Sequence, residues 1–220
     1  MNKTSGIFFS TGNLYKIEVG AVALLFTIGI ILHVTHLRSF AIGFTEIFLL
    51  VVNTWMLIRL FHVYYSPFML AWVVLTFVFT YITEVLGVKT GLIFGEYVYG
   101  EVMRVKMLQV PLIIALNWVL LILSSYSLAQ FLVKKRVFLP VISSVFIVIL
   151  DYFIEPVAMK LGYWNWINQE VPLQNYLAWF IVSFIFSSLL ANRETVIKIP
   201  VFRAFFVIQL LFFILLNIIG

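Results

Sequence analysis

Seven long apolar stretches run through the chain, and short polar or proline-containing segments separate them. About 20 apolar residues are needed to cross the hydrocarbon of a bilayer. The pattern therefore predicts seven spans, near residues 17–36, 42–62, 67–86, 110–132, 138–158, 173–191 and 200–219. Prolines, whose missing N–H costs nothing in the first helical turn, fall near five of the predicted starts: Pro67, Pro111, Pro140, Pro172 and Pro200. The predicted fold is an all-α, polytopic membrane helical bundle in one domain, residues 1–220.

Composition agrees with this interpretation and excludes several classes of protein. Hydrophobic residues make up 64% of the chain and charged residues 10%, far from the balance of a soluble protein. The chain has no cysteine, which excludes disulfides, thiolate catalysis and cysteine-bound metals. The net charge of +5 comes from bases in short loops, so we expect these to set membrane orientation and predict no nucleic-acid partner.

The distribution of basic residues predicts an orientation in the cell membrane. Counted over alternate sides, the larger share of the 14 lysines and arginines lies on the side of the N-terminus. The positive-inside bias then places the N-terminus in the cytoplasm and the C-terminus outside. Both long polar loops, 87–109 and 159–172, are expected on the outer side. The first apolar run ends in His33-Val-Thr-His36 rather than at a small-residue cleavage site, so we expect a retained span.

The middle of the chain contains a repeated pattern. Glu84, Lys89 and Gly91 have the same spacing as Glu155, Lys160 and Gly162. Aromatic residues follow each motif, then Val-Pro-Leu, then a tryptophan seven residues after the proline. We predict an internal duplication of a helix-loop-helix unit, about 67–132 and 138–191, with an axis along the membrane normal.

Only the second copy carries paired acids. Asp151 aligns with Thr80, and on a helix Asp151 and Glu155 lie on one face, one turn apart. An acid in hydrocarbon costs roughly 2.5–3.5 kcal/mol and usually marks a functional site. Burial and a second carboxylate favour retention of a proton. Such an acid can protonate an alkene if aromatic faces stabilise the cation that forms.

Polar residues in several spans crowd toward the predicted outer side, as expected for a site between bundle helices. The candidate catalytic residues are the acids and the lysines of the repeated motif: Asp151, Glu155, Glu84, Lys89 and Lys160. The candidate substrate-binding residues are polar or aromatic and lie near the same membrane depth: Tyr97, Trp118, Asn117, Trp164, Trp166, Asn175, Trp179, Glu46 and His33.

Other interpretations of these residues stay open at this point. Each glutamate of the repeat and the lysine five residues later are also placed to form an ion pair at a helix end, and Tyr and Trp are common in the interfacial belt of membrane proteins. His33 and His36 with the acids offer metal ligands, but the chain has no second histidine pair, so we predict no metal and no cofactor. No nucleophile-elbow, phosphate-loop or dinucleotide motif is present.

Three stretches together carry a resemblance to a known family: residues 83–99, 151–166 and 171–179. They resemble the bacterial and archaeal carotenoid biosynthesis membrane proteins, which include carotenoid 1,2-hydratases acting on bacterioruberin precursors and γ-carotene. The resemblance is strongest over about 80–180. It implies hydration of the terminal 1,2 double bond of an acyclic carotenoid end group to a tertiary alcohol, without a redox cofactor.

The implied partners are a hydrophobic carotenoid, the lipid bilayer and other enzymes of the carotenoid pathway. From the residues, we hypothesise that Asp151 donates the proton and that Glu155 or Glu84 orients the water, with Lys89 and Lys160 tuning their protonation. Two alternatives remain. One is a carotenoid (lycopene) cyclase or another isoprenoid-modifying membrane enzyme, and the other is a non-enzymatic carotenoid-binding or transport protein.

Overall fold

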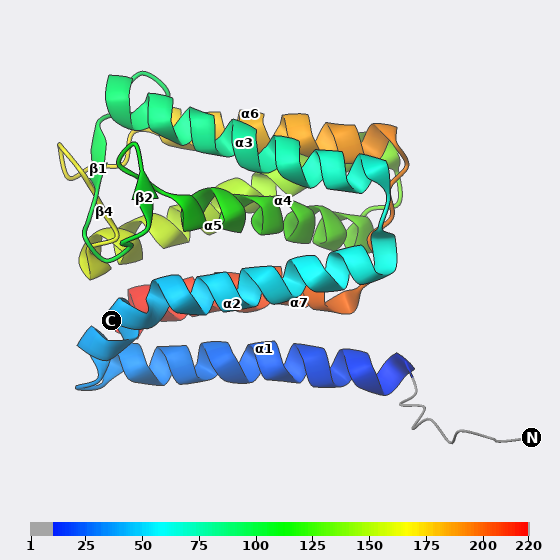
Figure 1. Ribbon diagram of the computed structural model, residues 1–220, viewed down its shortest axis with the longest axis horizontal. Helices are drawn as coiled ribbons and strands as arrows, with labels where there is room; N and C mark the ends of the chain where they lie inside the picture. Colours follow the sequence, from blue (N-terminus) through cyan, green and yellow to red (C-terminus); the bar gives the residue numbers. More distant parts are fainter. Residues whose placement is uncertain (1–10, 220) are drawn as a thin grey trace, which may run out of the picture.

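A computed structural model describes residues 11–219, and its architecture is a bundle of seven long helices within that range (Figure 1). They are α1 (Thr11–Val34), α2 (Arg38–Tyr64), α3 (Pro67–Thr90), α4 (Leu112–Leu132), α5 (Leu139–Leu161), α6 (Leu173–Asn192) and α7 (Pro200–Ile219). Each is long and apolar enough to cross a membrane. The predicted all-α bundle with seven spans is confirmed.

The helix ends follow the local sequence. The Ser66 side chain accepts a hydrogen bond of 3.1 Å from the Met69 N–H, and Pro67 begins α3. Gly91 and Gly162 end α3 and α5 in the left-handed region, with φ of 67° and 72°. These two helices extend a few residues beyond their predicted ends at 86 and 158. Hydropathy detects where the apolar run stops, whereas the glycine determines where the helix stops.

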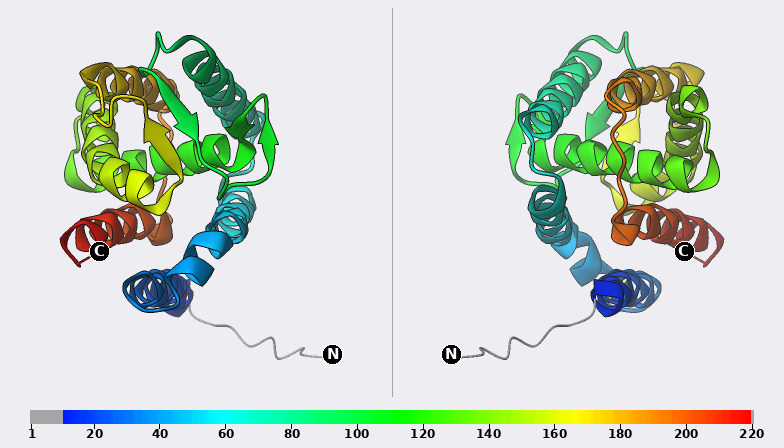
Figure 2. Two further views of the ribbon diagram at one scale, coloured as in Figure 1. Left: turned by 90° about the vertical axis from the view of Figure 1, so that its left-hand side faces the viewer. Right: turned by 90° about the vertical axis from the view of Figure 1, so that its right-hand side faces the viewer.

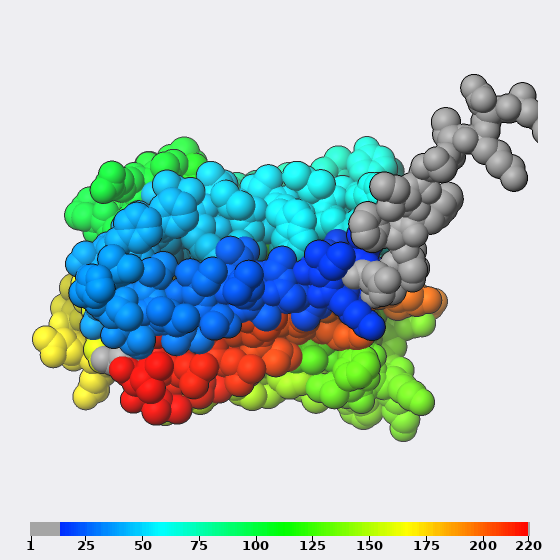
Figure 3. All heavy atoms as spheres, turned by 90° about the horizontal axis from the view of Figure 1, so that it is seen from below, coloured from blue at the N-terminus to red at the C-terminus, as the bar shows by residue number. Residues whose placement is uncertain are grey.

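Helix α4 lies at the centre of the bundle and α1 at its edge. α4 packs against α2, α3, α5, α6 and α7, whereas α1 packs mainly against α2 and α7. Figures 2 and 3 show α1 lying along the bundle beside α2 and α7. Large apolar side chains on the outer surface, such as Phe40 and Ile58, are 62% exposed. Such exposure suits contact with lipid rather than with water.

Small polar residues connect the central helices. The Ser125 and Ser143 hydroxyls lie 2.7 Å apart, and Ser187 donates to Ser143 at 3.0 Å. This chain of hydroxyls joins α4, α5 and α6. Small side chains let helices approach closely in a membrane, and hydroxyls add hydrogen bonds between them.

The two long loops lie at the same end of the bundle, as the sequence predicts, but they also form strands that it does not predict (Figure 1). β1 (Tyr97–Tyr99) pairs antiparallel with β4 (Trp164–Trp166). β2 (Lys106–Met107) pairs with β3 (Val110–Pro111), and a short 3₁₀ helix, Arg136–Phe138, precedes α5. Strands of two or three residues formed between distant loops leave no period that a sequence pattern can detect.

The register of β1 and β4 supports the predicted duplication. Val98 pairs with Asn165, and on either side Tyr97 pairs with Trp166 and Tyr99 with Trp164. An antiparallel pair centred in this way is what a two-fold axis through the middle of the pair produces. The helices that precede the two strands, α3 and α5, also both end at a left-handed glycine.

Substitution of Gly100 tests the contact between the two copies. The Gly100 N–H donates to the Tyr163 carbonyl at 2.9 Å, and a Cβ on Gly100 would lie 2.0 Å from the Gly162 carbonyl oxygen. Gly100→Ala must therefore separate the loops, and we expect a loss of about 1–3 kcal/mol in the free energy of unfolding. Thermal unfolding of the protein in detergent, followed by circular dichroism, measures this loss.

Gly20→Ala is the matched control, because a Cβ there meets nothing within 4 Å. Gly20 lies on an exposed part of α1, so alanine should leave stability unchanged or raise it slightly. Equal unfolding temperatures for the two variants would contradict the described contact.

Candidate functional site

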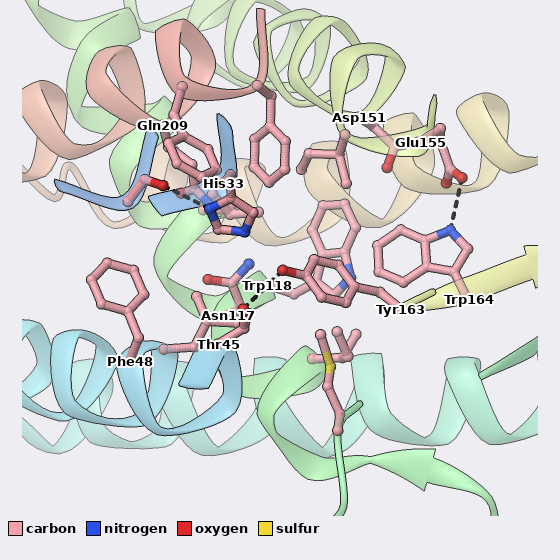
Figure 4. Close-up of a pocket in the computed structure, with 18 of the residues that line it drawn as sticks. His33, Thr45, Phe48, Asn117, Trp118, Asp151, Glu155, Tyr163, Trp164 and Gln209 are labelled. Carbon is pink, nitrogen blue, oxygen red and sulfur yellow. Dashed lines mark hydrogen bonds between the residues drawn. The ribbon is translucent and has the colours of Figure 1, made fainter. Parts of the chain in front are cut away.

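A cavity of about 290 Å³ lies within the bundle, near the end that carries β1 and β4 (Figure 4). Among the residues that line it are eleven predicted from the sequence: His33, Glu84, Tyr97, Asn117, Trp118, Asp151, Glu155, Trp164, Trp166, Asn175 and Trp179. They come from α1, α3, α4, α5, α6 and both long loops. The structure therefore brings together most of the predicted site.

Glu155 is held by the aromatic loop that follows its own helix. Its Oε2 accepts hydrogen bonds from the indole N–H groups of Trp164 at 2.8 Å and Trp166 at 2.7 Å. The side chain is buried, with 3% of the residue exposed. The two tryptophans are separated by one strand residue, so they share a face of β4 and both reach the carboxylate.

Glu84 is held in the same way by the first copy of the repeat. Its Oε2 accepts hydrogen bonds from the Tyr99 hydroxyl at 2.7 Å and from the Tyr97 hydroxyl. Tyr97 and Tyr99 occupy the β1 positions that pair with Trp166 and Trp164. Each copy thus carries a buried glutamate with two aromatic donors, phenols in the first copy and indoles in the second.

Asp151 lies one helical turn before Glu155 and is joined to it through Asn175 of α6. The Asn175 Nδ2 group donates to Asp151 Oδ2 at 2.7 Å and to Glu155 Oε1 at 3.3 Å. All three residues are at least 97% buried, with exposed fractions of 2–3%. One amide therefore fixes the positions of both carboxyl groups relative to each other.

Stacked aromatic rings form a wall of the cavity. The Trp118 and Trp179 rings lie 3.4 Å apart between centroids at an angle of 19°, and Phe94 stacks on Trp179 at 4.9 Å. Trp118 and Trp179 are the tryptophans that occupy equivalent positions in the two copies of the repeat. Their π faces offer the electron-rich surface that attracts a cation.

The loop tyrosines of the site are neutral donors at physiological pH. Burial raises the pKa of Tyr97 and Tyr99 well above the usual value, and the nearby Glu84 raises it further. Burial likewise raises the pKa of Tyr163 to about 12. These phenols therefore keep their protons at neutral pH.

We expect this shift to appear as a loss of stability in alkali. A tyrosine whose pKa is higher in the folded state binds its proton more tightly there, so stability is present below about pH 10 and declines as the pH rises further. Tyrosinate absorbance during alkaline titration should show that Tyr97 and Tyr99 ionise only on unfolding. In a variant with Tyr97 and Tyr99 both changed to Phe, the rise in tyrosinate absorbance that accompanies unfolding should be smaller, whereas the reversible rise in the folded protein should be unchanged. A smaller reversible rise in the folded protein would contradict the assignment.

Two predicted roles need correction. Lys89 and Lys160 are exposed, and among the described residues neither forms an ion pair with Glu84 or Glu155. A residue five positions along a helix points to a different face, so these lysines point away from the buried acids. The alternative of ion pairs at the helix ends is therefore wrong, and no ion pair in the described part of the chain supports the proposed tuning of the acids by lysine.

Glu46 was predicted to bind substrate, but it does not line the cavity. Its two carboxylate oxygens accept hydrogen bonds from the backbone N–H groups of Arg104 at 2.9 Å and Val105 at 3.0 Å. Glu46 therefore anchors the loop before β2 rather than a substrate. His36 is exposed and lies outside the cavity, and the described residues include no group of three or more potential metal-ligating side chains.

Several lining residues were missed in the sequence. Tyr99 has the same two-residue spacing from Tyr97 as Trp166 has from Trp164, so the repeat contained the signal that identifies it. Gln209 is an amide within an apolar span, which is a second usable signal. Thr45 and Tyr163, whose hydroxyls lie 2.8 Å apart across the cavity wall, left no such signal (Figure 4).

The cavity continues toward the lipid-facing surface along α1 and α2. Its lining there includes Leu25 and Ile28 of α1 and Phe40 and Phe44 of α2. These four side chains are between 42% and 62% exposed on the outer surface of the bundle. An apolar molecule dissolved in the bilayer can therefore meet the lining of the cavity without crossing water.

Comparison with known proteins identifies the family. The family of carotenoid biosynthesis proteins matches residues 44–219. This range includes all of the predicted lining residues named above except His33. The chain belongs to this family. It is also 31% identical over 122 residues to the bisanhydrobacterioruberin hydratase of Haloarcula japonica, a match that covers 51% of this chain and 41% of that protein. No solved structure matches the chain.

Proposed function

We propose that this carotenoid biosynthesis family protein is a hydratase, which adds water to the terminal 1,2 double bond of an acyclic carotenoid end group. The observation that carries the proposal is the pair of buried carboxyl groups, Asp151 and Glu155, held by Asn175 in a cavity that is otherwise mainly apolar and aromatic. The relative named as a hydratase supports the same class of reaction.

The hydrogen bonds favour Asp151 as the proton donor. Glu155 accepts three hydrogen bonds, from Trp164, Trp166 and Asn175, and these favour its charged form. Asp151 accepts one, from Asn175. Two buried carboxyl groups that are bridged by one amide do not both ionise readily, so one of them keeps a proton. The hydrogen bonds place this proton on Asp151.

The reaction then needs two bonds to form. Asp151 gives its proton to C2 of the end group, and the π electrons of the double bond form the new C–H bond, which leaves a tertiary cation at C1. The Trp118 and Trp179 faces and the charge of Glu155 stabilise this cation. A water oxygen bonds to C1 and releases one proton to Glu155. Transfer of that proton to Asp151 restores the site, so the balance requires only water.

We assign Glu84 to the opposite half of the site as an electrostatic and positioning group. Its Oε2 already accepts from Tyr97 and Tyr99, and within the described part of the chain no hydrogen-bonded residue connects it to Asp151. Its charge contributes to stabilisation of the cation, whereas Glu155 lies next to the proton donor. The water-orienting role that the sequence left open between the two glutamates is therefore given to Glu155.

A cyclase begins with the same protonation but lets a second double bond capture the cation, and this is the alternative that the site also accommodates. The two differ in product mass, because hydration adds one water and cyclisation adds nothing. The chain should be expressed in a bacterial host that makes lycopene or γ-carotene, and the pigments separated by chromatography with mass detection. A product heavier by one water supports the hydratase. A product of unchanged mass with altered absorption would establish the cyclase instead, and unchanged pigment would contradict both.

A further inference from the structure

A second polar cluster faces the same cavity and has no role in the proposed reaction. It consists of His33 of α1, Asn117 of α4 and Gln209 of α7. In Figure 4 these three side chains lie toward one end of the cavity and Asp151 and Glu155 toward the other, with Tyr163 between them. We call this group the amide-imidazole subsite.

Each member carries a buried polar atom that has no hydrogen-bond partner among residues 11–219. The atoms are His33 Nε2, Asn117 Oδ1 and Gln209 Oε1. His33 and Gln209 are 91% and 97% buried, with exposed fractions of 9% and 3%. Buried polar groups in native proteins nearly always have partners, so three orphans around one cavity indicate a ligand that supplies them.

The chemistry of the three atoms defines that ligand. His33 Nδ1 lies 2.7 Å from the Gly29 carbonyl oxygen, which can only accept, so Nδ1 carries the hydrogen. In the neutral ring Nε2 is then a hydrogen-bond acceptor, as are the two amide oxygens. Three acceptors together require a donor. A hydroxyl supplies one hydrogen and so donates to one of these acceptors, and an amide turned about its terminal bond donates its N–H to the hydroxyl oxygen instead. A water molecule supplies two hydrogens and accepts in the same way.

The surroundings restrict the donor to a neutral one on an apolar molecule, or to water. The Phe212 ring packs edge-on against His33 at 5.8 Å, and Phe26 packs against Phe48 and Phe212 at 5.4 and 5.3 Å. Phe48 and Phe212 also line the cavity. None of the three subsite residues is a carboxylate, which a cationic donor would favour.

We propose that the amide-imidazole subsite binds an O–H group inside the cavity. The proposal rests on the proposed function for the class of substrate, and that function offers two sources of the O–H. One is a hydroxyl already present on the carotenoid, which would make the subsite a determinant of specificity. The other is a water molecule kept in the cavity for the reaction.

Binding and turnover of two carotenoids distinguish these sources. Lycopene and its tertiary monoalcohol are added to purified protein in detergent, and binding is followed by quenching of tryptophan fluorescence, to which Trp118 and Trp179 in the cavity contribute. The variants are His33→Phe and the double variant Asn117→Leu/Gln209→Met, which keep side-chain size and remove the acceptors. Conversion of each carotenoid is measured in parallel.

If the substrate supplies the hydroxyl, wild-type protein should bind the alcohol at least about tenfold more tightly than lycopene, and both variants should lose this preference. If water supplies it, binding should not discriminate, but both variants should convert the two carotenoids at least about tenfold more slowly. Binding without preference together with unchanged conversion would overturn the proposal. The binding preference needs no turnover, so it tests the subsite even if the hydratase assignment fails.

Asn53→Leu is the matched control. Asn53 is fully buried in α2, and neither of its amide atoms has a partner among the described residues, but it does not line the cavity. Its replacement should change neither binding preference nor conversion. An effect of Asn53→Leu equal to that of the subsite variants would mean that loss of any buried amide perturbs the protein, and the proposal would fall.

Discussion

Asp151→Asn is expected to lower the rate of carotenoid hydration by about 10²–10⁴-fold, the usual contribution of a general acid. Asparagine keeps the shape of the side chain and can still accept the Asn175 hydrogen bond through its amide oxygen, but it has no acidic proton to give to the alkene. The protein should therefore accumulate in the membrane and bind carotenoid as before. Conversion per molecule of purified protein, together with fluorescence quenching for binding, measures the two effects separately.

Thr80→Val provides the control from the other copy of the repeat. Thr80 aligns with Asp151 and is fully buried, but its hydroxyl donates to the Thr76 and Phe77 carbonyl groups of its own helix. It does not line the cavity, so valine should leave conversion unchanged. Undiminished hydration by Asp151→Asn would remove Asp151 as the proton donor.

Glu155→Gln and Glu84→Gln should differ in size of effect, although the two glutamates occupy equivalent positions. Glu155 accepts the proton of the attacking water in the proposed reaction, so its loss is expected to slow conversion about 10²-fold or more. Glu84 acts through its charge and its two phenols, and we expect a loss of roughly tenfold. Single-turnover rates at saturating carotenoid measure this difference without the contribution of binding.

The ranking of these two variants separates the proposed roles. A larger loss for Glu84→Gln than for Glu155→Gln would transfer the water-orienting role to Glu84. Equal and small losses would show that neither carboxylate takes the proton of water. Each variant keeps an amide oxygen that can accept from the aromatic donors, so protein yield and unfolding temperature are expected to stay near those of the wild type.

The fold was largely predictable because the bilayer imposes strong rules on sequence. Seven apolar stretches of sufficient length required seven helices, and the prolines marked their starts. The candidate site was also partly predictable. Glu84, Asp151 and Glu155 are acids in apolar spans, and the free-energy cost of an acid in hydrocarbon indicates a functional role. The repeated motif also indicated the loops whose aromatic residues hold Glu84 and Glu155.

The rest depended on contacts between distant segments. Lys89 and Lys160 follow the glutamates closely in the sequence, yet the glutamates turn inward to aromatic donors while the lysines stay exposed. Glu46 resembles the other acids in sequence, but its partners are backbone groups of a loop 58 and 59 residues away. The pattern of a single sequence predicts which face of its helix a residue occupies. It does not predict which groups of distant segments that face contacts.

The most direct test of the central claim is to supply purified protein with lycopene in water enriched in heavy oxygen, without added cofactor. We predict a tertiary alcohol heavier by one water, with its oxygen derived from the solvent and, in a parallel reaction in deuterated water, one deuterium bound to C2. A product whose oxygen comes from molecular oxygen, or a converted product that gains no oxygen, would contradict hydration by acid-catalysed addition of water.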